Sequence, residues 1–277
     1  MSILTAVGLG LLIGTVLGGL GGAGAILAVP ALVYLLGQSA QDATTSSLVI
    51  VGLTAIVGAA DHARSGHVHW RTGIIFGVAG IAAAFAGTAL NRRVDEHVLL
   101  LGFSAVMVLA AGGMLIRTPG TVAATVRLPA IGPDLGPTIA FTPHRAQRRG
   151  HSRTGLLVRV LLAGLVVGFL TGFFGVGGGF VIVPALVLAL GLPMPAAVGT
   201  SLAIIAINAA ASLAARVGQT HFDWALIIPF AIAAMAGSFA GKNLADRLPN
   251  SALNRAFAIL LCGVATYIAL TSVLLPR

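Results

Sequence analysis

Two glycine-rich stretches, at 18–24 and 172–179, are the parts of this chain best suited to bind a ligand. Each lies in a long apolar run and is followed by a proline, Pro30 or Pro184. Glycine lets a backbone leave a helix and approach a ligand, and a helix that restarts there presents N–H groups and a positive dipole end to an anion. The alternative role of such glycines is close helix crossing. The candidate binding glycines are Gly21, Gly22, Gly24, Gly175, Gly177, Gly178 and Gly179.

Polar residues at the start of the next apolar segments could complete this site. Hydroxyl and amide groups hydrogen-bond the oxygens of an oxyanion, although they also cap helices and join helices to one another. A residue of this kind at matching places in both halves favours a shared role. The candidates are Ser46, Ser47, Thr200, Ser201 and Asn208.

Charged residues near the predicted spans are few. Lys242, the only lysine, is a further candidate for binding an anion, or it could extend to the membrane interface. We expect Asp61 and His62, at a helix end, to be interfacial rather than part of a proton relay. No Asp or Glu lies in the middle of a predicted span, which favours an anion over a cation as ligand. We predict no cofactor and no metal site, because the loop histidines lack the spacing of a ligand set.

The two glycine stretches belong to an internal repeat. An offset of 154 residues superimposes several glycines, a Val-Pro-Ala-Leu-Val segment, a Ser-Leu pair and a Phe-Ala-Gly triplet. Shared apolar composition would not align all of these in one register. The sequence therefore predicts two copies of one module.

The composition indicates that this module lies in a membrane. Hydrophobic residues make up 57% of the chain and charged residues 8%, whereas soluble proteins average about 25% charged residues. The net charge of +9 lies in short loops and one linker, which excludes a nucleic-acid partner and makes the lipid bilayer the expected one.

Apolar runs of the length needed to cross a bilayer predict an all-α polytopic protein with about four helical segments in each half. The first run of each half exceeds one straight crossing, which agrees with a break at its glycines. We predict membrane repeats at 1–117 and 155–277, joined by a cytoplasmic Pro/Arg-rich linker at 118–154. The predicted segments are Leu4–Gly37, Ala43–Ala60, Thr72–Leu90, Val98–Ile116, Val160–Gly191, Ala196–Ala215, Ala225–Gly241 and Ala256–Leu275.

The relative orientation of the two copies depends on the breaks. If each broken segment crosses once, the copies are parallel. If each break is a re-entrant hairpin, the copies are inverted. Counting arginines does not decide between them, and we favour inverted repeats.

The motifs of the second half resemble those of the sulfite exporter TauE/SafE family. They are Gly172–Phe180, Val183–Leu186, Gly199–Leu202, and Phe239–Gly241 ahead of Leu244 and Arg247. The first half departs from the pattern, with Ala23 and Ala25 in place of two glycines. The resemblance covers both halves without the linker. It implies a multi-pass permease of the bacterial plasma membrane that exports sulfite, sulfoacetate or related sulfur-containing anions.

We therefore expect a secondary transporter, working as an exporter of a small sulfur-containing anion by alternating access between the two repeats. A passive anion channel and a permease for another small organic acid are the alternatives. We do not expect an enzyme, because no paired acid and base lies at membrane depth. The expected partners are the anion and the lipid, and a homo-oligomer is left open.

Overall fold

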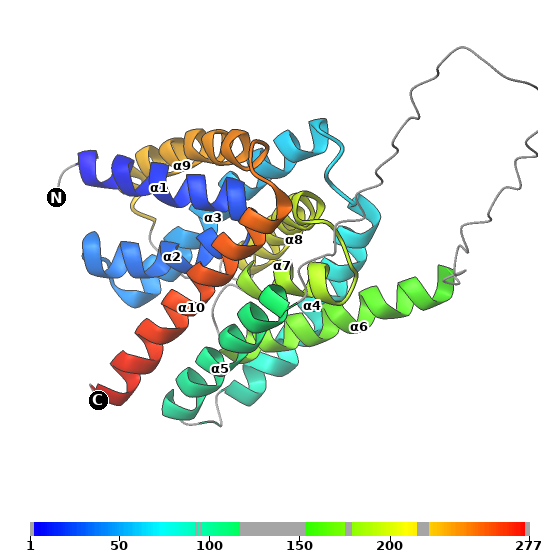
Figure 1. Cartoon of the computed structure of the whole chain (residues 1–277). Coiled ribbons are helices and arrows are strands. Elements are labelled where there is room, and N and C mark those ends of the chain that lie inside the picture. Colours follow the sequence, from blue (N-terminus) through cyan, green and yellow to red (C-terminus); the bar gives the residue numbers. More distant parts are fainter. Residues whose placement is uncertain are drawn as a thin grey trace, which may run out of the picture.

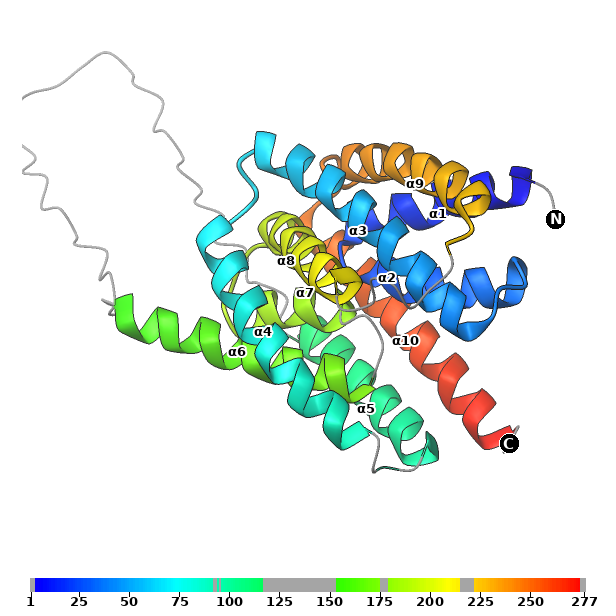
Figure 2. The same cartoon turned by 180° about the vertical axis from the view of Figure 1, so that it is seen from behind.

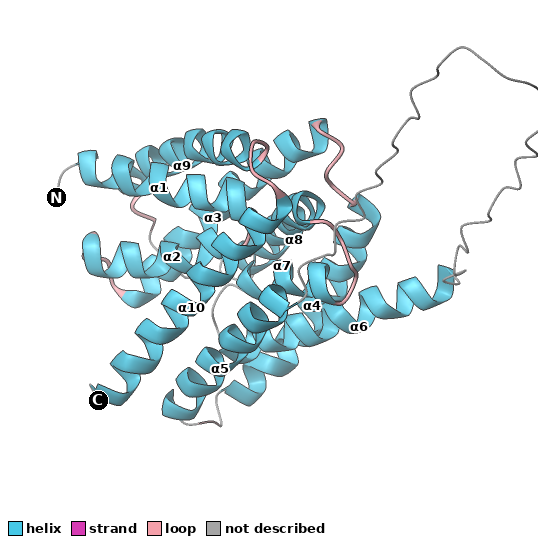
Figure 3. Ribbon diagram, in the orientation of Figure 1, coloured by secondary structure: helices cyan, strands magenta, loops and turns pink. Residues whose placement is uncertain are grey.

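The computed structural model describes residues 3–91, 94, 96–116, 153–174, 179–214 and 222–274, and this part of the chain is helical without a strand (Figure 3). The all-α prediction is confirmed. The predicted linker, except its last two residues, lies outside the described residues, as do Gly175, Gly177 and Gly178. The helices of the first half are α1 Ile3–Leu20, α2 Ala23–Pro30, the π-helix η1 Ala31–Leu35, α3 Ala40–Arg64, α4 Trp70–Asn91 and α5 Glu96–Ile116. Those of the second half are α6 Arg153–Phe174, α7 Gly179–Leu188, α8 Met194–Ala214, α9 Trp224–Ala245 and α10 Asn250–Leu274.

The first long apolar run is interrupted at its glycines. Gly21 has a φ of 66°, a left-handed conformation that ends α1 and that glycine adopts without strain. The chain resumes as α2 two residues later. In the second half, α6 ends at Phe174 and α7 begins at Gly179. Both α2 and α7 are too short to cross a bilayer, which needs about 20 residues.

Several helices have the length and composition of membrane spans. Six such segments are present in the described ranges: Asp42–Arg64, Trp70–Leu90, Leu157–Phe174, Met194–Ala214, Trp224–Ala245 and Asn250–Ile268. Large apolar side chains such as Val166, Ile232 and Ile259 are exposed on their outer faces. A surface of this kind is stable against hydrocarbon rather than water.

Helices at matching places in the two halves make reciprocal contacts. Helix α1 packs along α9 while α6 packs along α4, and α3 packs on α8 while α5 packs on α10 (Figures 1 and 2). The crossings depend on glycine: a Cβ at Gly14 would overlap the backbone of Ala234, and one at Gly168 would overlap the backbone of Gly80. Small residues let the backbones approach this closely. The orientation of the two halves in the membrane stays a prediction.

Several helices, among them α3 and α10, extend beyond their predicted bounds. Helix α3 begins at Ala40, where Ser39 is the N-cap and its Oγ accepts from the Asp42 N–H at 3.1 Å. Helix α10 begins at Asn250 rather than at Ala256. Hydropathy marks only the part of a helix that lies in hydrocarbon, whereas its backbone hydrogen bonds continue into the interface.

Candidate functional site

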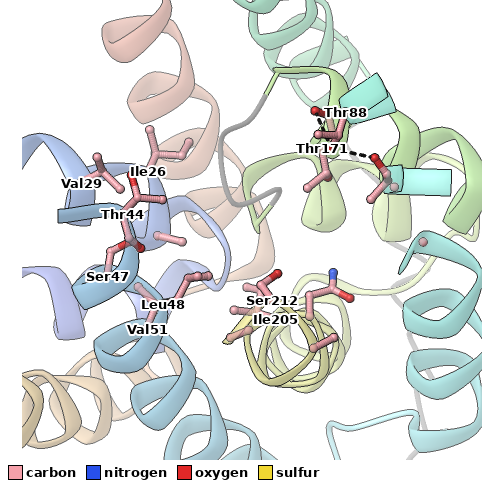
Figure 4. A pocket seen from close by; sticks show the side chains of 18 of the residues that line it. Ile26, Val29, Thr44, Ser47, Leu48, Val51, Thr88, Thr171, Ile205 and Ser212 are labelled. Carbon is pink, nitrogen blue, oxygen red and sulfur yellow. Dashed lines mark hydrogen bonds between the residues drawn. The ribbon is translucent and has the colours of Figure 1, made fainter. Parts of the chain in front are cut away.

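A cavity of about 570 Å³, partly open to the surface, lies between helices of both halves. In Figure 4, α2 and α3 contribute Ile26, Val29, Ser47 and Val51 to one wall, α8 contributes Ile205 and Ser212, and Thr88 and Thr171 lie opposite. The volume falls in the range of about 300–1,000 Å³ typical of small-molecule sites. Most lining residues are apolar. The polar ones are Thr44, Ser47, Thr88, Thr171, Asn208 and Ser212.

Of the predicted residues that the structure describes, Ser47 and Asn208 line this cavity. The hydroxyl of Ser47 donates to the carbonyl oxygen of Thr44 at 2.7 Å. Its oxygen lone pairs remain available as hydrogen-bond acceptors. The Oδ1 atom of Asn208 is buried and has no hydrogen-bond partner in the described part of the chain. An amide of this kind offers two N–H donors and an acceptor to a ligand.

The predicted hydroxyls at the start of α8 make packing contacts, Ser201 with the first break and Thr200 with the loop before α4. A Cβ at Gly21 would lie 2.6 Å from the Oγ of Ser201 and 3.1 Å from Val183. Ser201 donates to the carbonyl of Val198 at 2.8 Å, and Thr200 accepts from the main-chain N–H of His69 at 3.1 Å. Both side chains are fully buried and neither lines the cavity. Ser46 is likewise buried outside it.

The first break contacts the start of α7 directly. A Cβ at Gly22 would overlap the backbone of Gly179, and one at Gly179 would lie 2.8 Å from the Gly22 carbonyl oxygen. Gly24 packs in the same way against the backbone of Leu17. The N–H of Gly24 donates to the Gly21 carbonyl at 3.2 Å. At these glycines the backbone is therefore packed against backbone. The cavity lies beside the first break and is bordered by Ala25 and Pro30.

Lys242 lies away from the cavity and is paired. Its Nζ atom is 3.1 Å from Asp246 Oδ2 and 3.7 Å from Asp61 Oδ2. The residue is only 7% exposed, so the ammonium does not extend freely to the interface. His62, in the last turn of α3, is 2% exposed and so is buried within the protein, while its depth in the membrane stays a prediction.

Several cavity residues were not predicted. Thr88, Thr171 and Ser212 each stand alone in an apolar helix and carry no local motif. The hydroxyl of Thr171 donates to the Val167 carbonyl at 2.8 Å, and that of Thr88 donates to the Ala84 carbonyl at 2.9 Å. The sequence carries one indication that Thr88 belongs to the site, because the 154-residue offset pairs it with the candidate Lys242. The wall that Thr88 and Thr171 share arises only from the packing of α4 on α6.

The described lining of the cavity carries no charged side chain. Within the described residues, no group of three His, Cys, Asp or Glu could hold a metal ion. Recognition in such a cavity therefore rests on hydroxyl and amide hydrogen bonds and on apolar contact.

An all-helical chain with several bilayer-length helices and a cavity between its halves defines a multi-pass membrane protein. The model of the sulfite exporter TauE/SafE family matches residues 6–268, and the chain belongs to this family. It is accordingly a membrane transporter.

Curated relatives agree with this assignment. A "probable membrane transporter protein" of Xylella fastidiosa (strain 9a5c) is 32% identical over 270 residues, 96% of this chain and 95% of the relative. The "probable membrane transporter protein YunE" of Bacillus subtilis (strain 168) is 26% identical over 92% of this chain and 89% of its own length. No solved structure matches the chain significantly.

Cysteine labelling should separate the cavity from the lipid-facing surface. In a Cys262→Ala background, Ser212→Cys is expected to react with N-ethylmaleimide, because a thiol in a water-filled cavity ionises. Ile232→Cys, on an outer face with the native residue 59% exposed, should react at least about tenfold more slowly, because a thiolate does not form in hydrocarbon. Equal labelling rates, measured by mass shift in proteoliposomes, would show that the cavity is not open to water.

Proposed function

We propose that this protein is a secondary transporter that exports a small sulfur-containing anion, such as sulfite or an organosulfonate, by alternating access. The carrying observation is the cavity, whose walls come from both halves and hold six hydroxyl or amide residues. Family membership supports the choice of a sulfur oxyanion. Hydrogen-bond donors without a fixed charge can bind an oxyanion weakly enough to release it.

The cavity also bears on the size of the anion. A volume of about 570 Å³ accommodates an organosulfonate with water, and far exceeds what bare sulfite fills. The apolar part of its lining suits the methylene groups of such a molecule. We propose that transport involves no covalent chemistry on the substrate.

Flux into proteoliposomes tests this function. We expect saturable uptake of sulfite, thiosulfate or sulfoacetate, faster than that of acetate, and exchange stimulated by substrate on the opposite side. Protein-free liposomes are the control. If folded protein moves none of these anions, the proposal fails, and non-saturable flux without stimulated exchange would instead indicate a passive channel.

A further inference from the structure

The ends of α3 and α9 bring together charged side chains that the cavity does not use. We define Asp61, His62, Lys242 and Asp246 as the α3–α9 cluster. Its ion pairs join Lys242 to both carboxylates. His62 and Ser47 lie on the same helix, 15 residues and thus about 22 Å apart along its axis. The cluster is therefore a second polar centre, distinct from the cavity.

The imidazole of His62 is only half satisfied. Its Nε2 atom lies 3.1 Å from the carbonyl oxygen of Gly18, and because a carbonyl only accepts, this nitrogen carries a hydrogen. Its Nδ1 atom is buried without a hydrogen-bond partner among the described residues. Buried polar atoms normally have partners, and an unpartnered one calls for an explanation. The lone pair on Nδ1 is a place where a proton can bind.

Several ionisable groups surround His62. Lys242 and Asp246 face it from α9, His67 faces it from the following loop with a ring-centroid distance of 6.3 Å, and Asp61 precedes it. Helices α1 and α8, which also pack on α3, carry no titratable side chain. Two carboxylates thus stand against one ammonium.

The matching place in the other half shows that packing alone does not need these charges. The 154-residue offset pairs Lys242 with Thr88 and Gly18 with Gly172. There the hydroxyl of Thr88 lies 3.4 Å from the Gly172 carbonyl oxygen. A neutral hydroxyl therefore reaches the same carbonyl position at the equivalent crossing. The crossing of α4 and α6 therefore forms without a counterpart of Lys242.

We propose that His62 is a proton-binding site that couples proton movement to anion transport, an inference that rests on the proposed function. The Nδ1 atom takes up a proton from one aqueous side, forming an imidazolium, and returns the same proton to the other side. His67, half-buried in the loop, lies between His62 and the exposed chain and provides an entry route. The imidazolium strengthens the Nε2–H bond to Gly18, because charged donors bind more strongly. Gly18 lies three residues before the left-handed Gly21, so protonation acts on the segment that ends α1.

His62→Gln tests the coupling, because glutamine can still donate to Gly18 but cannot take up a proton. Purified protein in proteoliposomes is given labelled sulfoacetate, whose sulfonate stays ionised where sulfite itself takes up a proton. We expect the variant to exchange sulfoacetate at equal pH within about twofold of wild type. Accumulation driven by a pH gradient should fall at least about tenfold, together with the signal of an entrapped pH dye. His69→Gln, an exposed histidine in the same loop, is the matched control and should behave as wild type.

The outcomes separate the two proposals. If wild type moves no anion, the proposed function fails, and this inference fails with it. If wild type moves sulfoacetate without protons, or if His62→Gln keeps both pH-driven accumulation and the dye signal, only the proton site is overturned.

Asp246→Asn provides a second test that does not depend on the folding of a core variant. The carboxylate of Asp246 is 39% exposed, and asparagine can still accept from Lys242. Removal of one negative charge from the cluster should move the pH midpoint of coupled uptake to lower pH, by roughly half a unit or more. Asp223→Asn, at the other end of α9, should leave the midpoint in place. An unchanged midpoint in Asp246→Asn would contradict the role of this cluster.

Discussion

Asn208→Leu is expected to lower the kcat/KM of anion transport by about 10- to 100-fold, because a hydrogen bond to a charged group contributes about 1.5–3 kcal/mol. Leucine has nearly the size of asparagine but neither donates nor accepts. The Oδ1 atom of Asn208 has no partner among the described residues, so the substitution breaks no hydrogen bond of that atom and instead removes a buried unpaired acceptor. The folded protein should therefore be as stable as wild type or slightly more so. Initial rates of sulfoacetate uptake in proteoliposomes measure the effect.

The matched control is Asn243→Leu, an exposed asparagine near the end of α9. It makes the same chemical change away from the cavity and should leave the uptake rate within about twofold of wild type. Equal rates for Asn208→Leu and wild type would remove the amide from the binding site. A loss of folded Asn208→Leu protein in size-exclusion chromatography would assign the residue to packing instead.

Gly14→Val should cause the second large effect, a loss of stability at the crossing of α1 and α9. A Cβ at this position overlaps the backbone of Ala234, which no rotamer change can relieve. The two helices must separate, and overpacking of this kind typically costs about 1–3 kcal/mol or more. We expect the Tm in detergent to fall by about 5 °C or more, or the monodisperse peak to disappear.

Gly8→Val on the same helix is the control. A Cβ at Gly8 meets no atom within 4 Å, so this change carries the same helix-propensity difference without an overlap. A Tm close to that of wild type is expected for Gly8→Val. If both variants lost the same stability, the effect would come from the helix itself and not from the crossing.

These two predictions separate two roles, the close packing of helices by small residues and the binding of a ligand by a polar residue. Gly14 and Gly168 are needed because backbones meet there, whereas Asn208 faces a cavity without serving the fold. The glycines at the breaks combine both features. Gly21 ends α1 by its φ of 66°, and Gly22 meets Gly179 where the two short helices begin.

The sequence by itself determined the elements. Apolar runs of bilayer length predict membrane helices because the burial of each residue in hydrocarbon is a local property of its side chain. The breaks could be located for the same reason, since a residue such as Gly21 acts on its own backbone. Ser47 and Asn208 were identified as ligand-binding candidates because polar side chains are costly inside a membrane unless they have a partner.

Only the tertiary structure decided which residues share a surface. The cavity wall joins Thr88 of α4 to Thr171 of α6 through crossings separated by a long stretch of chain, and no local pattern encodes that contact. The same holds for Lys242. Its place in the sequence fits a lysine at the membrane interface, whereas its pairing with Asp61 requires α9 to lie against α3. Hydropathy depends on each residue alone, whereas a binding site depends on distances between helices, and these are set by how closely their small residues allow the backbones to approach.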